Sequence, residues 1–122
     1  MCGIIGCINE AEVAPILVEG LKRMEYRGYD SAGAATLNDG NMTIKKNTGR
    51  VEEIDKKESL SLLQGHIGIA HTRWATHGKV CQLNSHPISS CDGKVAVVHN
   101  GIIENYVELR KMLEEKNHKI KT

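Results

Sequence analysis

Cys2, which directly follows the initiator methionine, is the residue best suited to covalent chemistry. Removal of Met1 would give this one residue both a thiol nucleophile and a free α-amine. An α-amine titrates near ~7.7–8.0, and a general base works best when its pKa lies close to the working pH. The Cys2 thiol could therefore be activated by the amine of its own residue. The alternative is that Cys2 is an ordinary small residue at the start of a strand.

A second group of candidates lies where a predicted strand enters a long loop. The Arg73 guanidinium could form a bidentate pair with a substrate carboxylate, or Arg73 could be a surface arginine. Trp74, the only tryptophan, could anchor the core or form a lid that excludes water. His77 could be a structural hydrogen-bonding residue. A catalytic cysteine–histidine pair with Cys81 or Cys91 is also possible, although neither cysteine lies in a recognisable local motif.

Asn100 and Gly101 directly follow a predicted strand. Asn-Gly is a common two-residue hairpin turn. However, the next segment has the pattern of a helix rather than of a returning strand. The alternative is an oxyanion hole, in which the asparagine amide and the glycine N–H point at one developing negative oxygen. The sequence leaves these two interpretations open.

The hydrophobic pattern predicts a series of strands and helices that position these candidates. Strands are predicted at 2–9, 32–37, 42–47, 66–73, 95–98 and 118–122. Of these, 2–9 and 95–98 are expected to be buried, and an Asp-Gly turn is expected to join 32–37 to 42–47. Helices are predicted from an Asn9–Glu12 capping pair to Gly28, within 51–63, and after an Asn105–Glu108 capping pair. Residues 74–93 form a long loop, and long ordered loops in compact domains are usually functional.

The composition excludes several classes of function. The 122 residues are enough for one small domain, and a formal charge of +1 provides no basic surface for nucleic acid. The apolar runs are too short to span a membrane, and no secretory leader precedes Cys2. We therefore expect no nucleic-acid or membrane partner, and a cytoplasmic location. The spacing of the four cysteines does not match a structural zinc motif, so we expect no metal site.

Four stretches together resemble the class II glutamine amidotransferases. They are Cys-Gly-Ile at 2–4, Tyr-Arg-Gly-Tyr-Asp-Ser-Ala-Gly at 26–33, His-Thr-Arg-Trp-Ala-Thr-His-Gly at 71–78, and Val-Val-His-Asn-Gly-Ile-Ile-Glu-Asn-Tyr at 97–106. Within that group, the sequences at 26–33 and 71–78 are similar to those of the glutaminase domain of the glutamine–fructose-6-phosphate aminotransferases. The resemblance extends over essentially the whole chain.

The resemblance implies an α+β fold, the αββα sandwich of antiparallel sheets of the N-terminal-nucleophile hydrolases, incomplete at the C-terminus. It implies that Cys2 is the nucleophile, with Asn100 and Gly101 as the oxyanion hole. It further implies that Arg73 holds the glutamine carboxylate with Thr76 and His77 beside it, and that Trp74 and Arg27 close the site and gate ammonia transfer. No cofactor is implied, and L-glutamine is the expected substrate.

The resemblance also implies that the family's domain continues past Thr122. The aspartate that holds the glutamine ammonium group would lie in that later part, as would the domains that bind fructose 6-phosphate. We therefore expect residues 1–122 to be the N-terminal part of a glutaminase domain, with negligible activity alone, in a protein that forms a homo-oligomer. The alternative function is that of an inactive fragment which folds by self-association or complementation, because unpaired strand edges recruit partners.

Overall fold

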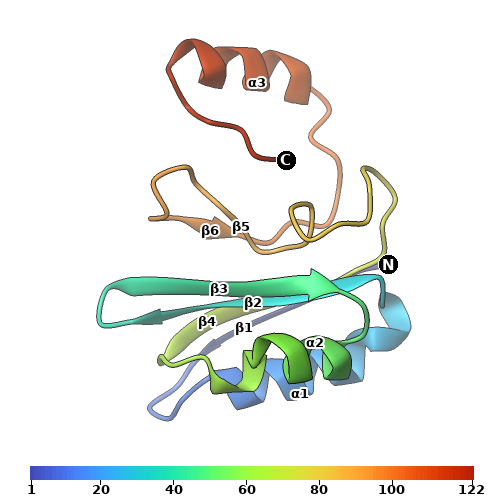
Figure 1. The fold of residues 1–122 in the computed structure, drawn as a ribbon, viewed down its shortest axis with the longest axis vertical. Coiled ribbons are helices and arrows are strands. Elements are labelled where there is room, and N and C mark those ends of the chain that lie inside the picture. The colour runs from blue at the N-terminus through green and yellow to red at the C-terminus, as the bar shows by residue number, and fades with distance from the viewer.

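The computed structural model describes all residues from 1 to 122, and they form four layers. Figure 1 shows two helices on one side, then a four-stranded sheet, then a two-stranded sheet, and a third helix on the far side. The order of layers is therefore αββα, as the resemblance implied. None of the helices is both long and apolar enough to cross a membrane.

The four-stranded sheet is antiparallel and places the N-terminus beside the end of a strand from the middle of the chain. It contains β1 (Gly3–Ile8), β2 (Ser31–Asn38), β3 (Asn41–Thr48) and β4 (Ile67–Arg73), in the spatial order β1-β4-β2-β3. Gly3 pairs with Thr72, and Ser31 pairs with Arg73. The beginnings of β1 and β2 and the end of β4 therefore meet at one end of the sheet.

The predicted hairpin between β2 and β3 is confirmed. Asp39 and Gly40 form its turn, with φ angles of 49° and 77°. A two-residue turn of the type that matches strand twist requires positive φ at both positions, which is why Asp-Gly is favoured there.

Two helices cover one face of this sheet. They are α1 (Ala14–Met24) and α2 (Val51–Glu58), and each is followed by one 3-10 turn, η1 (Glu25–Arg27) and η2 (Leu60–Leu62). The predicted first helix is present, and Val13, Leu17 and Leu21, at the spacing of one helix face, are fully buried. The core is therefore built between these helices and the sheet, and its main members are Val13, Ala14, Leu17, Val18, Leu21, Ala32, Ala34, Val51, Ile54, Leu60, Leu63 and Ala70.

The other face of the sheet is covered by the long loop and by the second sheet. This two-stranded sheet consists of β5 (Ile88–Ser89) and β6 (Ala96–Val97), and α3 (Tyr106–Glu115) lies beyond it. The loop approaches β2 so closely that a Cβ added at Gly33 would lie 2.4 Å from the His86 carbonyl oxygen. Close approach on both faces explains why β2 consists largely of alanine and glycine.

The predicted capping pair before α1 is wrong. Val13 precedes the helix and forms no side-chain cap. Asn9 instead accepts the Glu10 N–H at 2.8 Å, and the Glu12 carboxylate accepts the Gly65 N–H. Glu12 therefore ties the start of α1 to the turn before β4, a long-range contact that competes with local capping.

The predicted burial of two strands is also wrong. In β1 the side chains alternate between the two faces, and Ile4 and Ile8 are exposed. In the 95–98 segment only Ala96 and Val97 form a strand, and Val97 is half exposed. Both strands have one covered face, so an apolar run alone did not distinguish one buried face from two.

The C-terminal predictions are corrected in part. Asn105 does precede α3, but its side chain forms no capping hydrogen bond, and no residue of α3 is buried. Residues 118–122 form no strand. They run back from the helix toward the second sheet (Figure 1).

Candidate functional site

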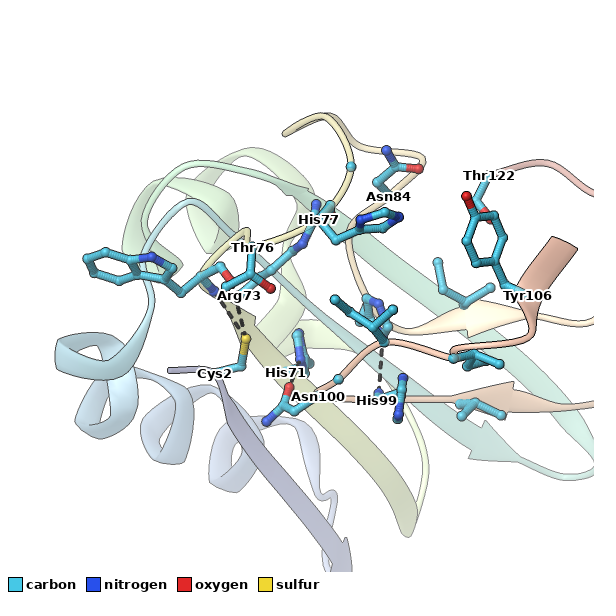
Figure 2. A pocket seen from close by; sticks show the side chains of 18 of the residues that line it. Cys2, His71, Arg73, Thr76, His77, Asn84, His99, Asn100, Tyr106 and Thr122 are labelled. Carbon is cyan, nitrogen blue, oxygen red and sulfur yellow. Dashed lines mark hydrogen bonds between the residues drawn. The ribbon is translucent and has the colours of Figure 1, made fainter.

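Seven of the eight candidate residues line one cavity of about 600 Å³ at the shared end of the two sheets. Its lining includes Cys2, Arg73, Trp74, Thr76, His77, Asn100 and Gly101. Figure 2 labels the side chains of Cys2, Arg73, Thr76, His77 and Asn100, which come from the N-terminus, the end of β4, the loop after it and the segment after β6. The fold thus joins residues that lie about a hundred positions apart in the sequence.

The Cys2 thiol is held against the backbone of Trp74. The Trp74 N–H donates to Cys2 Sγ at 3.2 Å, and the thiol donates to the Trp74 carbonyl at 3.6 Å. The next residue has to be glycine, because a Cβ on Gly3 would lie 2.8 Å from both Met24 Cβ and Thr72 Oγ1. The backbone of Trp74 and the close packing at Gly3 therefore fix where the Cys2 sulfur lies.

Arg73 is 8% exposed and organises the loop that follows it. Its guanidinium donates to the carbonyl of His77 and, at 3.4 Å, to the carbonyl of Lys79. A guanidinium has five N–H donors. The remaining donors can therefore hold a carboxylate in the cavity while the loop stays closed around the side chain.

Asp30, which the sequence analysis did not single out, anchors the end of β4. Its carboxylate accepts the Ala75 N–H and the Ser31 hydroxyl hydrogen, and its own N–H donates to the Arg73 carbonyl at 3.2 Å. Gly28 lies so close that an added Cβ would be 2.6 Å from the Arg73 carbonyl carbon. Gly28 and Asp30 of the Arg-Gly-Tyr-Asp motif therefore hold the end of β4 and the start of the loop after it.

Asn100 and Gly101 form a short irregular segment after β6, not a hairpin turn. Asn100 Oδ1 lies 2.6 Å from Nε2 of His71, a buried residue of β4. Gly101 has a φ of 147°, a region that side chains disfavour. The segment is therefore held by a contact to the first sheet and by a glycine-specific backbone.

Two histidines beneath this segment were also missed. The rings of His71 and His86 are stacked with their centroids 4.7 Å apart, and the His99 N–H donates to His86 Nδ1 at 3.2 Å. Burial lowers the pKa of His71, and burial together with the nearby His71 and Arg73 lowers the pKa of His86 to about 4. Both imidazoles are therefore neutral at pH 7.

A lysine holds the loop that carries His86. The Lys46 ammonium donates to the carbonyls of Leu83, Ser85 and Pro87 at 3.3, 2.6 and 2.9 Å. Burial lowers the pKa of Lys46, partly offset by Cys81 nearby, which raises it. All three ammonium hydrogens have acceptors, so Lys46 fastens this loop to β3.

Aromatic contacts hold Trp74 and His77, two residues that line the cavity. Tyr29 meets Trp74 edge-to-face with centroids 5.7 Å apart, and Tyr106 meets His77 at 6.0 Å. Arg27 lies outside the cavity, and its Nε–H donates to the neighbouring Tyr26 hydroxyl at 2.8 Å. The gating role of Arg27 stays a prediction.

The cysteine–histidine alternative gains no support for His77. Cys81 and Cys91 do not line the cavity, and all four cysteines are free thiols. Cys91 instead lies 3.3 Å from Nδ1 of His118, on the surface. Cys2 is therefore the thiol that faces the cavity.

Comparison with protein families shows a match over most of this chain. Residues 38–122 match a family described as "Glutamine amidotransferase domain". The chain is 54% identical over 118 residues to a glutamine–fructose-6-phosphate aminotransferase (isomerizing) of Pyrococcus horikoshii, and 52% identical over 122 residues to that of Clostridium acetobutylicum. These alignments cover 97% and 100% of this chain and 20% of each relative. The chain thus spans about a fifth of the length of these relatives.

Solved structures show the same fold. A glutamine phosphoribosylpyrophosphate amidotransferase from B. subtilis matches 98% of this chain and 26% of its own, with a TM-score of 0.80 and 27% identity. A structure described as the allosteric regulatory enzyme of purine biosynthesis matches 100% of this chain and 27% of its own, with a TM-score of 0.82 and 28% identity. The α+β architecture is therefore that of the N-terminal-nucleophile hydrolases.

Proposed function

Since the chain belongs to the glutamine amidotransferase family, we propose that it hydrolyses the side-chain amide of L-glutamine, with Cys2 as the nucleophile. The observation that carries the proposal is the convergence of a thiol, a guanidinium and an asparagine–glycine pair on one cavity. These groups match the three needs of the reaction: attack, anchoring of the substrate and stabilisation of charge.

Binding would begin with the glutamine α-carboxylate on Arg73. The guanidinium is buried and its position is fixed by the carbonyls of His77 and Lys79, so little side-chain freedom would be lost on binding. Thr76 and His77 line the same part of the cavity. The substrate side chain would then extend through the cavity toward Cys2.

Chemistry would begin when the Cys2 sulfur attacks the amide carbon, after the α-amine has accepted the thiol proton. The carbonyl oxygen would take up the negative charge and receive hydrogen bonds from the Asn100 side chain and the Gly101 N–H. The amine would return the proton to the departing ammonia, leaving a glutamyl thioester that water cleaves to glutamate. This route requires removal of Met1, which is 78% exposed and accessible.

The destination of the ammonia is a second part of the proposal. The two relatives described above are named for aminotransfer to fructose 6-phosphate. We infer that residues 1–122 form the N-terminal part of the domain that releases ammonia for that sugar phosphate in a longer polypeptide. That polypeptide would act as a homo-oligomer.

The test is replacement of Asn100 by alanine in the natural full-length polypeptide. The variant should lower kcat for glutamine hydrolysis by ~10²–10³, with little change in KM, because the lost donor acts on the transition state. Asn105→Ala is the matched control, since Asn105 is a nearby exposed asparagine without a side-chain hydrogen bond. Joint loss of folding and of glutamine affinity would instead make Asn100 a turn residue.

A second candidate function is association through exposed apolar surface. Val95, Val97, Ile102, Ile103 and Val107 are each at least half exposed on or beside the second sheet and α3. Exposed apolar side chains on neighbouring segments favour a partner. Residues 1–122 expressed alone should then run above their monomer mass in size-exclusion chromatography and hydrolyse glutamine negligibly. A monomer that turns over glutamine within tenfold of the full-length polypeptide would rule out this candidate.

A further inference from the structure

His71 makes a contact that the proposed mechanism does not use. It is 1% exposed in β4, yet its Nε2 lies 2.6 Å from Oδ1 of Asn100, a residue exposed to the cavity. Figure 2 shows the His71 ring and the Asn100 side-chain oxygen facing each other. A buried ring on the first sheet thus reaches the segment that follows the second sheet.

The hydrogen-bond roles in this pair are determined by chemistry. An amide oxygen can only accept, so Nε2 carries the hydrogen and donates it. The other ring nitrogen, Nδ1, is buried without a partner. A hydrogen on Nδ1 would be a buried donor without an acceptor, and a doubly protonated ring would add a charge close to Arg73. The neutral Nε2–H form is therefore the consistent one.

We propose that His71 is a positioning residue that fixes which end of the Asn100 amide faces the substrate. With Oδ1 held by His71, the NH2 group is the free end and can donate to the oxyanion. Rotation of the amide by half a turn would exchange the two ends. The oxygen would then face the developing negative charge and repel it. This inference rests on the proposed function and deepens it.

His86 supports this arrangement from below. Its ring stacks on His71, and its Nδ1 accepts the backbone N–H of His99, the residue before Asn100. The stacked rings therefore hold two consecutive residues of the segment, one by its backbone and one by its side chain. His71 acts on the amide itself, which makes it the residue to test.

The experiment compares His71→Met, which has no donor, with His71→Gln, whose amide can still donate. Glutamine hydrolysis is measured in the natural full-length polypeptide. The Met variant should lower kcat about tenfold or more. This decrease should stay smaller than the ~10²–10³-fold expected for loss of the whole Asn100 donor, and KM should change less than about threefold. The Gln variant should recover most of kcat. His66→Met, directly before the same strand, is the matched control and should leave kcat unchanged.

A double-mutant cycle separates positioning from general loss of stability. Because His71 acts through Asn100, His71→Met should lower kcat little further when Asn100 is already alanine. An equal loss in both backgrounds, or no loss in either, would overturn the proposal.

A second measurement needs neither folding of a variant nor turnover. Long-range ¹H–¹⁵N correlation spectra of the wild-type imidazoles should show the hydrogen of His71 on Nε2. A hydrogen on Nδ1 would overturn the proposal, even in an active enzyme. A natural full-length polypeptide with Met1 removed that fails to hydrolyse glutamine would instead refute the proposed function, and the spectra would still test the tautomer.

Discussion

Replacement of Asp30 by alanine should weaken both the fold and the active site. The Asp30 carboxylate accepts the Ala75 N–H and the hydroxyl hydrogen of Ser31, which is 1% exposed. A hydrogen bond to a charged group contributes ~1.5–3 kcal/mol, and a buried hydroxyl left unpaired costs ~1–3 kcal/mol. Asp30 is half-buried, so water can replace part of the loss. We expect the free energy of unfolding to fall by ~2–4 kcal/mol.

Thermal unfolding followed by circular dichroism measures this change. For a chain of this length ~1 kcal/mol shifts Tm by roughly 4 °C, so the alanine variant should melt ~8–16 °C lower. Asp30→Asn keeps an acceptor oxygen but loses the charge, and it should lose about half as much. Asp39→Asn, at the exposed hairpin turn, is the matched control and should not change Tm.

Asp30→Ala should also disturb the position of the Cys2 thiol, because Ala75 follows Trp74, whose N–H contacts Cys2 Sγ. The rate at which iodoacetamide labels Cys2, read by peptide mapping, should differ between Asp30→Ala and wild type well below Tm. An alanine variant that melts within ~2 °C of wild type would refute the anchoring role argued for Asp30.

Three further outcomes are expected. Arg73→Lys should raise KM for glutamine about tenfold to a hundredfold, because an ammonium replaces the bidentate guanidinium and a hydrogen bond to a charged group is worth ~1.5–3 kcal/mol. An unchanged KM would remove Arg73 from carboxylate binding. Protein that retains Met1 should label slowly at Cys2 with glutamine-mimicking electrophiles, and equal rates with and without Met1 would exclude the α-amine as base. The pKa of His86 is lowered from 6.5 to about 4, so the unfolded chain binds more protons between these values, and unfolding free energy should fall as pH drops from 6.5 toward 4. His86→Gln should flatten that part of the profile by up to ~1.4 kcal/mol per pH unit, and an unchanged profile would contradict it.

Much of the scaffold could be predicted because its signals are local. The period of α1, the Asp-Gly turn and the alternation in β4 each depend on residues within a few positions of one another. The capping pair of Asn9 and Glu12 failed for the opposite reason. Glu12 is satisfied by Gly65, 53 positions away, and no local pattern reports that contact.

The same distinction applies to the site. Cys2, Arg73 and Asn100 could be proposed from residue type and position at the end of an element. His71 and Asp30 could not, because their roles depend on which residue lies opposite them in the fold. His71 reads as a core residue of a strand until Asn100, 29 positions later, is placed beside it.

The strand order has a consequence for how the molecule folds. The β2–β3 hairpin closes over a two-residue turn, whereas β1 pairs with β4, and Gly3 contacts Thr72 across 69 positions. The entropy lost on closing a loop grows with its length, and pairings between distant segments form slowly. Because the chain is made from its N-terminus, Cys2 leaves the ribosome first. Because β1 pairs with a distant strand, Cys2 is expected to reach its place beside Trp74 late. In that interval the N-terminus is free, so Met1 can be trimmed before the thiol is in position to react.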